Sequence, residues 1–173
     1  MFFSFHYEAD SWRTAQIRNI HSIQGMKKIE DNEWERVSQS GSAGIKRWID
    51  DQLNRAEFTI VLVGTETYSR KWIQYEIRKS RSLGIPIAGI RIHGLKDQAR
   101  QTSKQGKNPF EGVPYGPISV DHSSEMLCHD PEGRTSRERY AWIEANIEGI
   151  LDESKNALRG HWLWAEWKLR GIS

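Results

Sequence analysis

The stretch F-T-I-V-L-V-G-T-E-T-Y-S-R-K-W-I-Q-Y-E-I-R-K-S-R-S-L, residues 58–83, decides the fold. Its first part, residues 58–63, is a nearly unbroken apolar run rich in Ile and Val. Such a run is typical of a strand that is covered on both faces, as in a parallel sheet. Gly64 ends the run, and a polar turn then leads into a predicted helix that begins near Ser69.

Seven residues of this predicted helix recur at three- and four-residue spacings, so they share one face. They are Ser69, Trp72, Ile73, Glu76, Ile77, Ser80 and Leu83. This face should meet the sheet, although it carries a carboxylate, which is costly to remove from water. Glu76, one turn after Trp72, is therefore either a functional group or part of a structural ion pair with Lys79.

Other apolar runs predict strands at residues 2–5, 85–92 and 118–120, and Gly84 separates the central helix from the second of these. Periodicity predicts a helix that begins at Asp10 or Ser11, one over residues 44–56, and one after a T-x-x-E capping box at Thr135. Strand, helix and strand with short joins form a βαβ unit. We therefore expect an α/β domain of flavodoxin-like character, with a central, mostly parallel sheet flanked by helices.

The whole chain, residues 1–173, is expected to form one domain, with residues 156–173 as a possible added helix. Residues 21–43 have no steady period and are interpreted as a loop beside the site, in which a weak strand could lie. Residues 93–117 are expected to form a surface loop. The tail H-W-L-W-A-E-W-K-L, residues 161–169, is either a packed helix or a surface for a partner.

Composition excludes several classes of function. A net charge of +2 without a dense Lys or Arg run argues against nucleic-acid binding. No apolar segment approaches the roughly 18 residues that span a bilayer, and the N-terminal M-F-F-S-F-H-Y lacks the features of a signal peptide. Cys128 is the single cysteine, which excludes a disulfide within the chain and favours a reducing, cytoplasmic location. His122, Cys128, His129 and Asp130 match no zinc signature, so no metal site is predicted.

Three segments carry a resemblance to a known family: F-F-S-F-H-Y-E-A-D at residues 2–10, W-R-T-A-Q-I-R-N at 12–19, and I-V-L-V-G-T-E-T-Y-S-R-K-W-I-Q-Y-E-I at 60–77. They resemble TIR-like domains, and in particular the ThsB-type TIR-like proteins of bacterial Thoeris antiphage systems. With I-A-G-I-R-I-H at 87–93 and N-P-F at 108–110, the resemblance covers about the first two thirds of the chain. Its most specific part is the S-x-x-W-x-x-x-E element formed by Ser69, Trp72 and Glu76.

The resemblance implies a TIR-type fold and an enzyme related to NAD nucleosidases and ADP-ribosyl cyclases, with Glu76 as the catalytic residue. NAD would be the substrate, with no separate cofactor, and the product a cyclic or modified ADP-ribose that signals to an effector. Self-association and a phage protein as trigger are further expected partners. Residues expected to bind the substrate are Phe5, His6, Tyr7, Asn19, Ser69 and Trp72. Some of these side chains could instead be core or uninvolved surface groups, and Arg18 and Asn19 could simply cap or pair on their helix.

Two readings compete with the enzyme. TIR-like domains can act as adaptors that assemble with like domains and catalyse nothing, and fold alone does not decide between these functions. A third possibility is a sensor that binds a nucleotide without turning it over. Glu76 weighs against an adaptor, because a scaffold has no need of a carboxylate on the face that meets the sheet.

Overall fold

The computed structural model describes residues 1–20, 37–111 and 126–169, and the side chains of residues 1–20, 37–111 and 126–158. In these ranges four strands form one parallel sheet of order β1-β2-β3-β4. The strands are β1 (Phe2–Ser4), β2 (Thr59–Val63), β3 (Ile87–Arg91) and β4 (Cys128–His129). The helices are α1 (Tyr7–Arg18), α4 (Gly41–Leu53), the short 3-10 helix η1 (Thr67–Ser69), α5 (Lys71–Ser82) and α6 (Ser136–Leu169).

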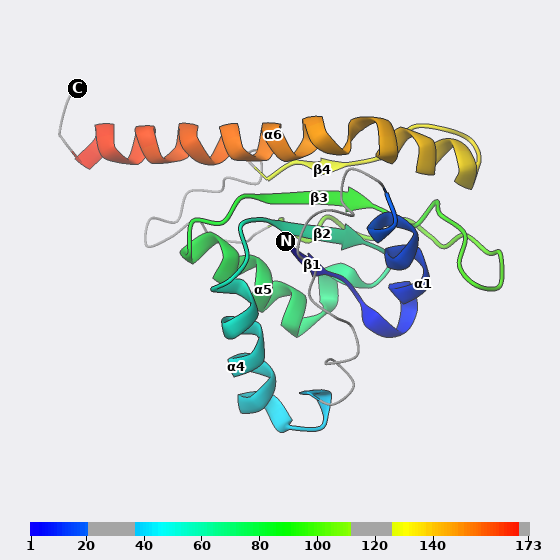
Figure 1. The fold of residues 1–173 in the computed structure, drawn as a ribbon, viewed down its shortest axis with the longest axis horizontal. Helices are drawn as coiled ribbons and strands as arrows, with labels where there is room; N and C mark the ends of the chain where they lie inside the picture. The colour runs from blue at the N-terminus through cyan, green and yellow to red at the C-terminus, as the bar shows by residue number, and fades with distance from the viewer. Residues whose placement is uncertain (21–36, 112–125, 170–173) are drawn as a thin grey trace.

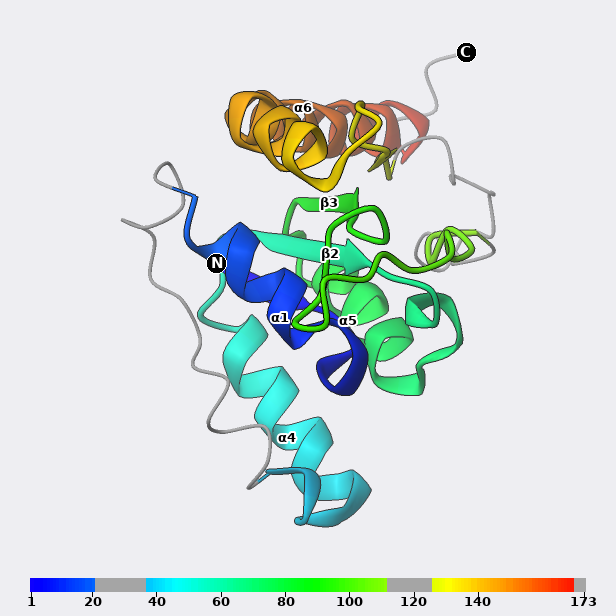
Figure 2. The same ribbon diagram turned by 90° about the vertical axis from the view of Figure 1, so that its right-hand side faces the viewer.

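Helices cover both faces of the sheet, as an α/β domain requires. Residues of α1 and α6 share one apolar core with the sheet, and residues of α5 share a second. The helix α4 packs beside α5 through a third cluster that reaches β1. Figure 1 shows α6 along the β3–β4 side of the sheet and α4 on the opposite side, and Figure 2 gives the same arrangement from the end.

The continuous apolar run of β2 follows from this arrangement, because successive side chains of a strand point to opposite faces. Ile60 and Leu62 pack with residues of α1 and α6, whereas Val61 and Val63 pack with residues of α5. All four side chains are fully buried. The predicted α/β class with a parallel sheet is therefore confirmed.

A buried arginine fixes α1 against the segment that follows β3. The Nη1 of Arg13 lies 3.1 Å from Oδ1 of Asp10, and its other nitrogens donate to the carbonyl oxygens of Leu95 and Gln101. A Cβ at Gly64 would lie only 2.0 Å from Oδ2 of Asp10, so the end of β2 approaches this carboxylate only because Gly64 has no side chain. These contacts hold the turn between β1 and α1 in place.

Several predicted boundaries were wrong. The central helix begins at Lys71 rather than near Ser69, because Arg70 is extended (φ −80°, ψ 117°) and separates η1 from α5. Ser69 therefore belongs to η1 and is exposed, and Leu83, which follows the last residue of α5, is exposed as well, so neither belongs to the buried face. The first helix begins at Tyr7, so neither Asp10 nor Ser11 caps it.

The remaining predictions fall partly outside the described residues. The helix predicted over residues 44–56 is observed as α4, three residues earlier, so residues 41–43 are helical rather than loop. The strand predicted at 118–120 and most of the loop predicted at 21–43 lie outside the described ranges. Residues 92–111 contain no regular helix or strand, as expected for the first part of the predicted surface loop.

The C-terminal helix agrees with its predicted start. The capping box at Thr135 is present: Glu138 N–H donates to Thr135 Oγ1, and Thr135 N–H donates to Glu138 Oε2. Residues 156–169 continue α6 and do not form a separate helix. No described helix is both long and apolar enough to span a bilayer.

The strand β4 was not predicted, because Cys128 and His129 were interpreted as loop residues. Burial raises the pKa of the Cys128 thiol to about 11, so this thiol is a poor nucleophile at neutral pH. Within the described residues no group of three His, Cys, Asp or Glu side chains could hold a metal ion.

A close approach at Gly89 of β3 gives a test of this packing. A Cβ there would lie 2.5 Å from Cε2 of Phe110, which is fully buried, and 3.2 Å from the Cα of Cys128. We expect Gly89→Ala to lower the free energy of unfolding by about 1–3 kcal/mol, because the Phe110 ring must shift. Chemical denaturation measures this change.

The matched control is Gly149→Ala in α6, where a Cβ would meet nothing within 4 Å. A helix-interior glycine is costly, so this substitution should raise the free energy of unfolding by about 0.5–1 kcal/mol. Equal effects of the two substitutions would contradict the observed packing of Phe110 over β3.

Candidate active site

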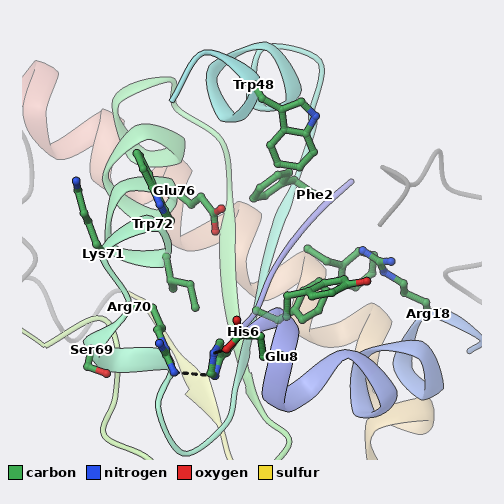
Figure 3. A pocket seen from close by; sticks show the side chains of 14 residues that line it. Phe2, His6, Glu8, Arg18, Trp48, Ser69, Arg70, Lys71, Trp72 and Glu76 are labelled. Carbon is green, nitrogen blue, oxygen red and sulfur yellow. Dashed lines mark hydrogen bonds and ion pairs between the residues drawn. The ribbon is translucent and has the colours of Figure 1, made fainter. Parts of the chain in front are cut away.

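A cavity of about 360 Å³ opens at the carboxyl end of β1. In parallel α/β sheets this end of the strands is where ligands bind. Its wall comes from β1 and the turn after it, from α1, from α4, and from the start of α5 (Figure 3). The lining residues are Phe2, Phe3, Phe5, His6, Tyr7, Glu8, Arg18, Trp48, Ser69, Arg70, Lys71, Trp72, Ile73 and Glu76.

Glu76 reaches the cavity from the buried face of α5, and the residue is only 6% exposed. The hydroxyl of Ser4 donates to its Oε2 over 2.5 Å. Ser4 faces α5 because it pairs in register with Val61, whose side chain packs against Ile73 and Ile77 of the same helix. The strand register and the helix packing together bring this hydroxyl and this carboxyl into contact.

The environment of Glu76 favours its neutral form. Burial raises the pKa of Glu76 to about 8, and the hydrogen bond from Ser4 opposes this effect only in part. The ion pair with Lys79 that the sequence left open is not formed, because Lys79 Nζ lies 3.7 Å from Asp50 Oδ1 instead. A buried carboxyl with a raised pKa on a cavity wall is typical of functional sites.

Aromatic side chains surround Glu76. Trp72 is half-buried and packs edge-on against Tyr75, with 6.1 Å between ring centroids. Figure 3 shows Trp48 of α4 above Phe2, with the Glu76 carboxyl pointing into the space that they border. Flat apolar walls of this kind suit a planar ring.

The opposite end of the cavity is charged. His6 Nδ1 lies 3.4 Å from Arg70 Nη2 and 3.7 Å from Glu66 Oε2, and its Nε2 lies 3.7 Å from Glu8 Oε2. Arg70 also pairs with Glu66. His6 is therefore part of a mixed network of charges at the cavity wall rather than an isolated surface group.

Arg18 adds a further positive charge beside two aromatic rings. Its guanidinium carbon lies 5.0 Å from the centroid of the Phe3 ring and 5.4 Å from that of the Phe5 ring. Such contacts stabilise the cation and restrict its position. Phe5 in turn lies 6.2 Å from the Tyr7 ring.

Six of the seven residues that the resemblance implied for the site line this one cavity. They are Phe5, His6, Tyr7, Ser69, Trp72 and Glu76. Asn19 is the exception: it is exposed at the end of α1 and does not line the cavity, whereas its neighbour Arg18 does.

Sequence reasoning missed Phe2, Ser4, Trp48 and Arg70 as site residues. Trp48 recurs with Ile45, Ile49 and Leu53 at helical spacing, and periodicity cannot distinguish a cavity wall from a core. The polar Ser4 inside an apolar strand was the one available signal, but its partner lies 72 positions away in the sequence.

Comparison with known proteins identifies the relatives of this chain. Residues 2–97 match a family model described as "Thoeris protein ThsB, TIR-like domain". A Bacillus cereus (strain MSX-D12) protein named "Putative cyclic ADP-D-ribose synthase ThsB1" is 34% identical over 121 residues. This match covers 66% of the present chain and 62% of the relative, so it spans less than two thirds of the relative's length.

The raised pKa of Glu76 predicts how stability depends on pH. Between about pH 4.5 and 8 the folded protein holds a proton that the unfolded chain releases, so stability falls as the pH rises. Glu76→Gln removes this titration and leaves an acceptor for the Ser4 hydroxyl. The variant should exceed the wild type in unfolding free energy by a margin that grows across this window, to about 2–4 kcal/mol.

Thermal unfolding of both proteins from pH 5 to pH 9 measures the margin. Glu144→Gln, at an exposed position of α6, is the control, and its margin should stay constant over the same range. A Glu76→Gln margin that is the same at pH 5 and pH 8 would contradict the buried, uncharged state of this carboxyl.

Proposed function

The chain belongs to the ThsB-type family of TIR-like domains, and from this premise we propose that it cleaves NAD at the bond between nicotinamide and ribose. The remaining part would become a cyclic or otherwise modified ADP-ribose that acts as a signal. The parallel sheet with helices on both faces is the flavodoxin-like, TIR-type fold that the sequence predicted.

One observation carries the proposal: a nearly buried carboxyl, that of Glu76, lies on the wall of a cavity at the carboxyl end of β1. It lies in the family's W-x-x-x-E element, one turn after Trp72, and the Bacillus cereus relative is named "Putative cyclic ADP-D-ribose synthase ThsB1". These facts support a catalytic role for Glu76 beside a bound dinucleotide.

The reaction needs little besides electrostatic stabilisation. When the bond from the ribose C1′ to nicotinamide breaks, nicotinamide keeps the electron pair and leaves as a neutral molecule, so no general acid is needed. Positive charge develops on the ribose as in an oxocarbenium ion, and a carboxylate beside it lowers the barrier. A nucleophilic group of the ADP-ribose, or water, then bonds to C1′ and loses its proton to solvent. Exclusion of water favours cyclisation over hydrolysis.

Substrate binding would also convert Glu76 to its reactive form. With a pKa of about 8, the carboxyl is largely protonated in the free protein at pH 7. The nicotinamide ring of NAD carries a positive charge, and a nearby cation favours the ionised carboxylate. Because the site is poorly solvated, this carboxylate interacts with the developing charge more strongly than it would in water.

The cavity wall offers side chains that suit the two kinds of group in NAD. Phe2, Trp48 and Trp72 offer flat apolar surfaces near Glu76 for a planar ring. The guanidinium of Arg18, and that of Arg70, which also pairs with Glu66, are donors on the wall that suit a diphosphate. The proposal has four further parts, which the family resemblance suggests. They are signalling to an effector, a cytoplasmic location, activation by a phage protein, and self-association.

The direct test incubates the purified chain with NAD, with and without extract of phage-infected cells, and measures nicotinamide release by chromatography. We expect release by the wild type and a loss of at least about a hundredfold in Glu76→Gln, because a neutral amide does not stabilise the cationic transition state. Circular dichroism verifies that the variant is folded.

Unchanged turnover in the variant would remove Glu76 from the mechanism. NAD binding without release would favour a sensor, and absence of both would favour an adaptor.

The pH dependence of the reaction gives a second test. Since the ionised carboxylate is the active form, kcat/KM should rise tenfold per pH unit below about pH 8 and level off above it. The rise in kcat should lie at lower pH, because the bound cationic ring lowers the pKa of Glu76 in the complex. Steady-state rates from pH 5.5 to 9.5 measure both, and flat profiles would show that no such ionisation controls the rate.

A further inference from the structure

Two buried hydroxyl contacts join α5 to the sheet. Ser4 of β1 donates to Glu76 over 2.5 Å, and Thr59 of β2 lies 2.9 Å from Ser80, Oγ1 to Oγ. Glu76 and Ser80 are one helical turn apart on α5, and all four residues are buried. Of these four residues only Glu76 lines the cavity, so the first contact involves a cavity residue and the second does not.

We propose that Ser4 is a positioning residue for Glu76: its hydroxyl holds Oε2 so that Oε1 stays available to the substrate. This inference rests on the proposed function, which it deepens. Within the described residues Oε1 accepts no hydrogen bond, while Oε2 is taken by Ser4. One oxygen of the carboxyl thus fixes its orientation, and the other is left for a ribose hydroxyl or for the developing cation.

A hydroxyl is well suited to this task because it carries no charge. An arginine or lysine in its place would hold the carboxylate but neutralise the negative charge that the cationic transition state requires. The Ser4 hydroxyl fixes the carboxyl and leaves its charge for the substrate. Its own position is fixed by β1, which pairs with the buried strand β2, and groups on rigid elements are held most accurately.

The charged groups around Glu76 have other partners or lie apart from it. His6 contacts Glu8 and Glu66, and Arg70 pairs with Glu66.

The charged side chains of α5 itself also have other partners. Lys79 pairs with Asp50 of α4, and Lys71 lies over the Trp72 ring. Arg18 of α1 lies over the rings of Phe3 and Phe5. None of them forms an ion pair with Glu76, so Ser4 is its direct polar partner among the described residues.

The test compares Ser4→Ala with Ser80→Ala. Each removes one buried serine hydroxyl between α5 and the sheet, so both should lower the melting temperature by a similar amount. Ser4→Ala should also lower kcat about tenfold to a hundredfold with little change in KM, and should move the rise of kcat/KM to higher pH. Ser80→Ala should keep kcat and KM within about twofold of the wild type. Equal kinetic effects of the two substitutions would overturn the proposal.

A second measurement does not depend on any activity. Titration of the Glu76 carboxyl carbon by ¹³C NMR gives its proton affinity directly in the free protein. Removal of a hydrogen bond to the charged form should raise that affinity about tenfold in Ser4→Ala and leave it unchanged in Ser80→Ala. The same midpoint in both variants would overturn the role of Ser4, whether or not NAD is cleaved.

These arms separate the two proposals. A wild type that binds NAD but never releases nicotinamide overturns the proposed function, while the titration still decides whether Ser4 holds Glu76. If Ser4→Ala does not fold, Ser4→Cys keeps nearly the same volume and replaces a strong donor by a weak one. In Ser4→Cys, Glu76 should bind its proton more tightly than in the wild type. An affinity for the proton equal to that of the wild type would overturn the proposal.

Discussion

The site depends on one hydrogen bond, in which the Ser4 hydroxyl of β1 holds the buried Glu76 carboxyl of α5. Burial of Glu76 costs free energy that a leucine at the same position would not. The contact from Ser4 offsets part of this cost, and the apolar packing of Ile73 and Ile77 on β2 supplies the rigid frame around it. A protein selected only for stability would have no reason to keep such a group there.

The rest of the fold holds the other parts of the cavity wall around that carboxyl. The buried pair of Arg13 and Asp10 ties α1, and with it the turn that carries His6, to the segments that follow β2 and β3. The packing of α4 on α5 brings Trp48 of α4 to the cavity wall. No single element forms the site, so the geometry at Glu76 depends on the whole α/β arrangement rather than on one motif.

Sequence reasoning succeeded where burial follows a regular pattern along the chain, and it failed where the end of an element or a distant partner decides. The strand β2 and the helix α5 were recognised because an unbroken apolar run and a helical stripe each have one structural explanation. The start of α5 was missed because the extended Arg70 is a local backbone choice that no periodicity reports. The strand β4, of two residues, is too short for any pattern. Among site residues, His6 was found by resemblance, whereas Trp48 and Ser4 became visible only through tertiary contacts.

The most direct test of the account is a crystal structure of the Glu76→Gln variant with NAD bound. The account predicts that the side chain at position 76 lies within hydrogen-bonding distance of a hydroxyl of the nicotinamide ribose, with one of its two terminal atoms still bonded to Ser4. The nicotinamide ring should lie against the aromatic wall formed by Phe2, Trp48 and Trp72. A dinucleotide bound with that ribose outside the cavity, and position 76 in contact with Ser4 alone, would contradict it.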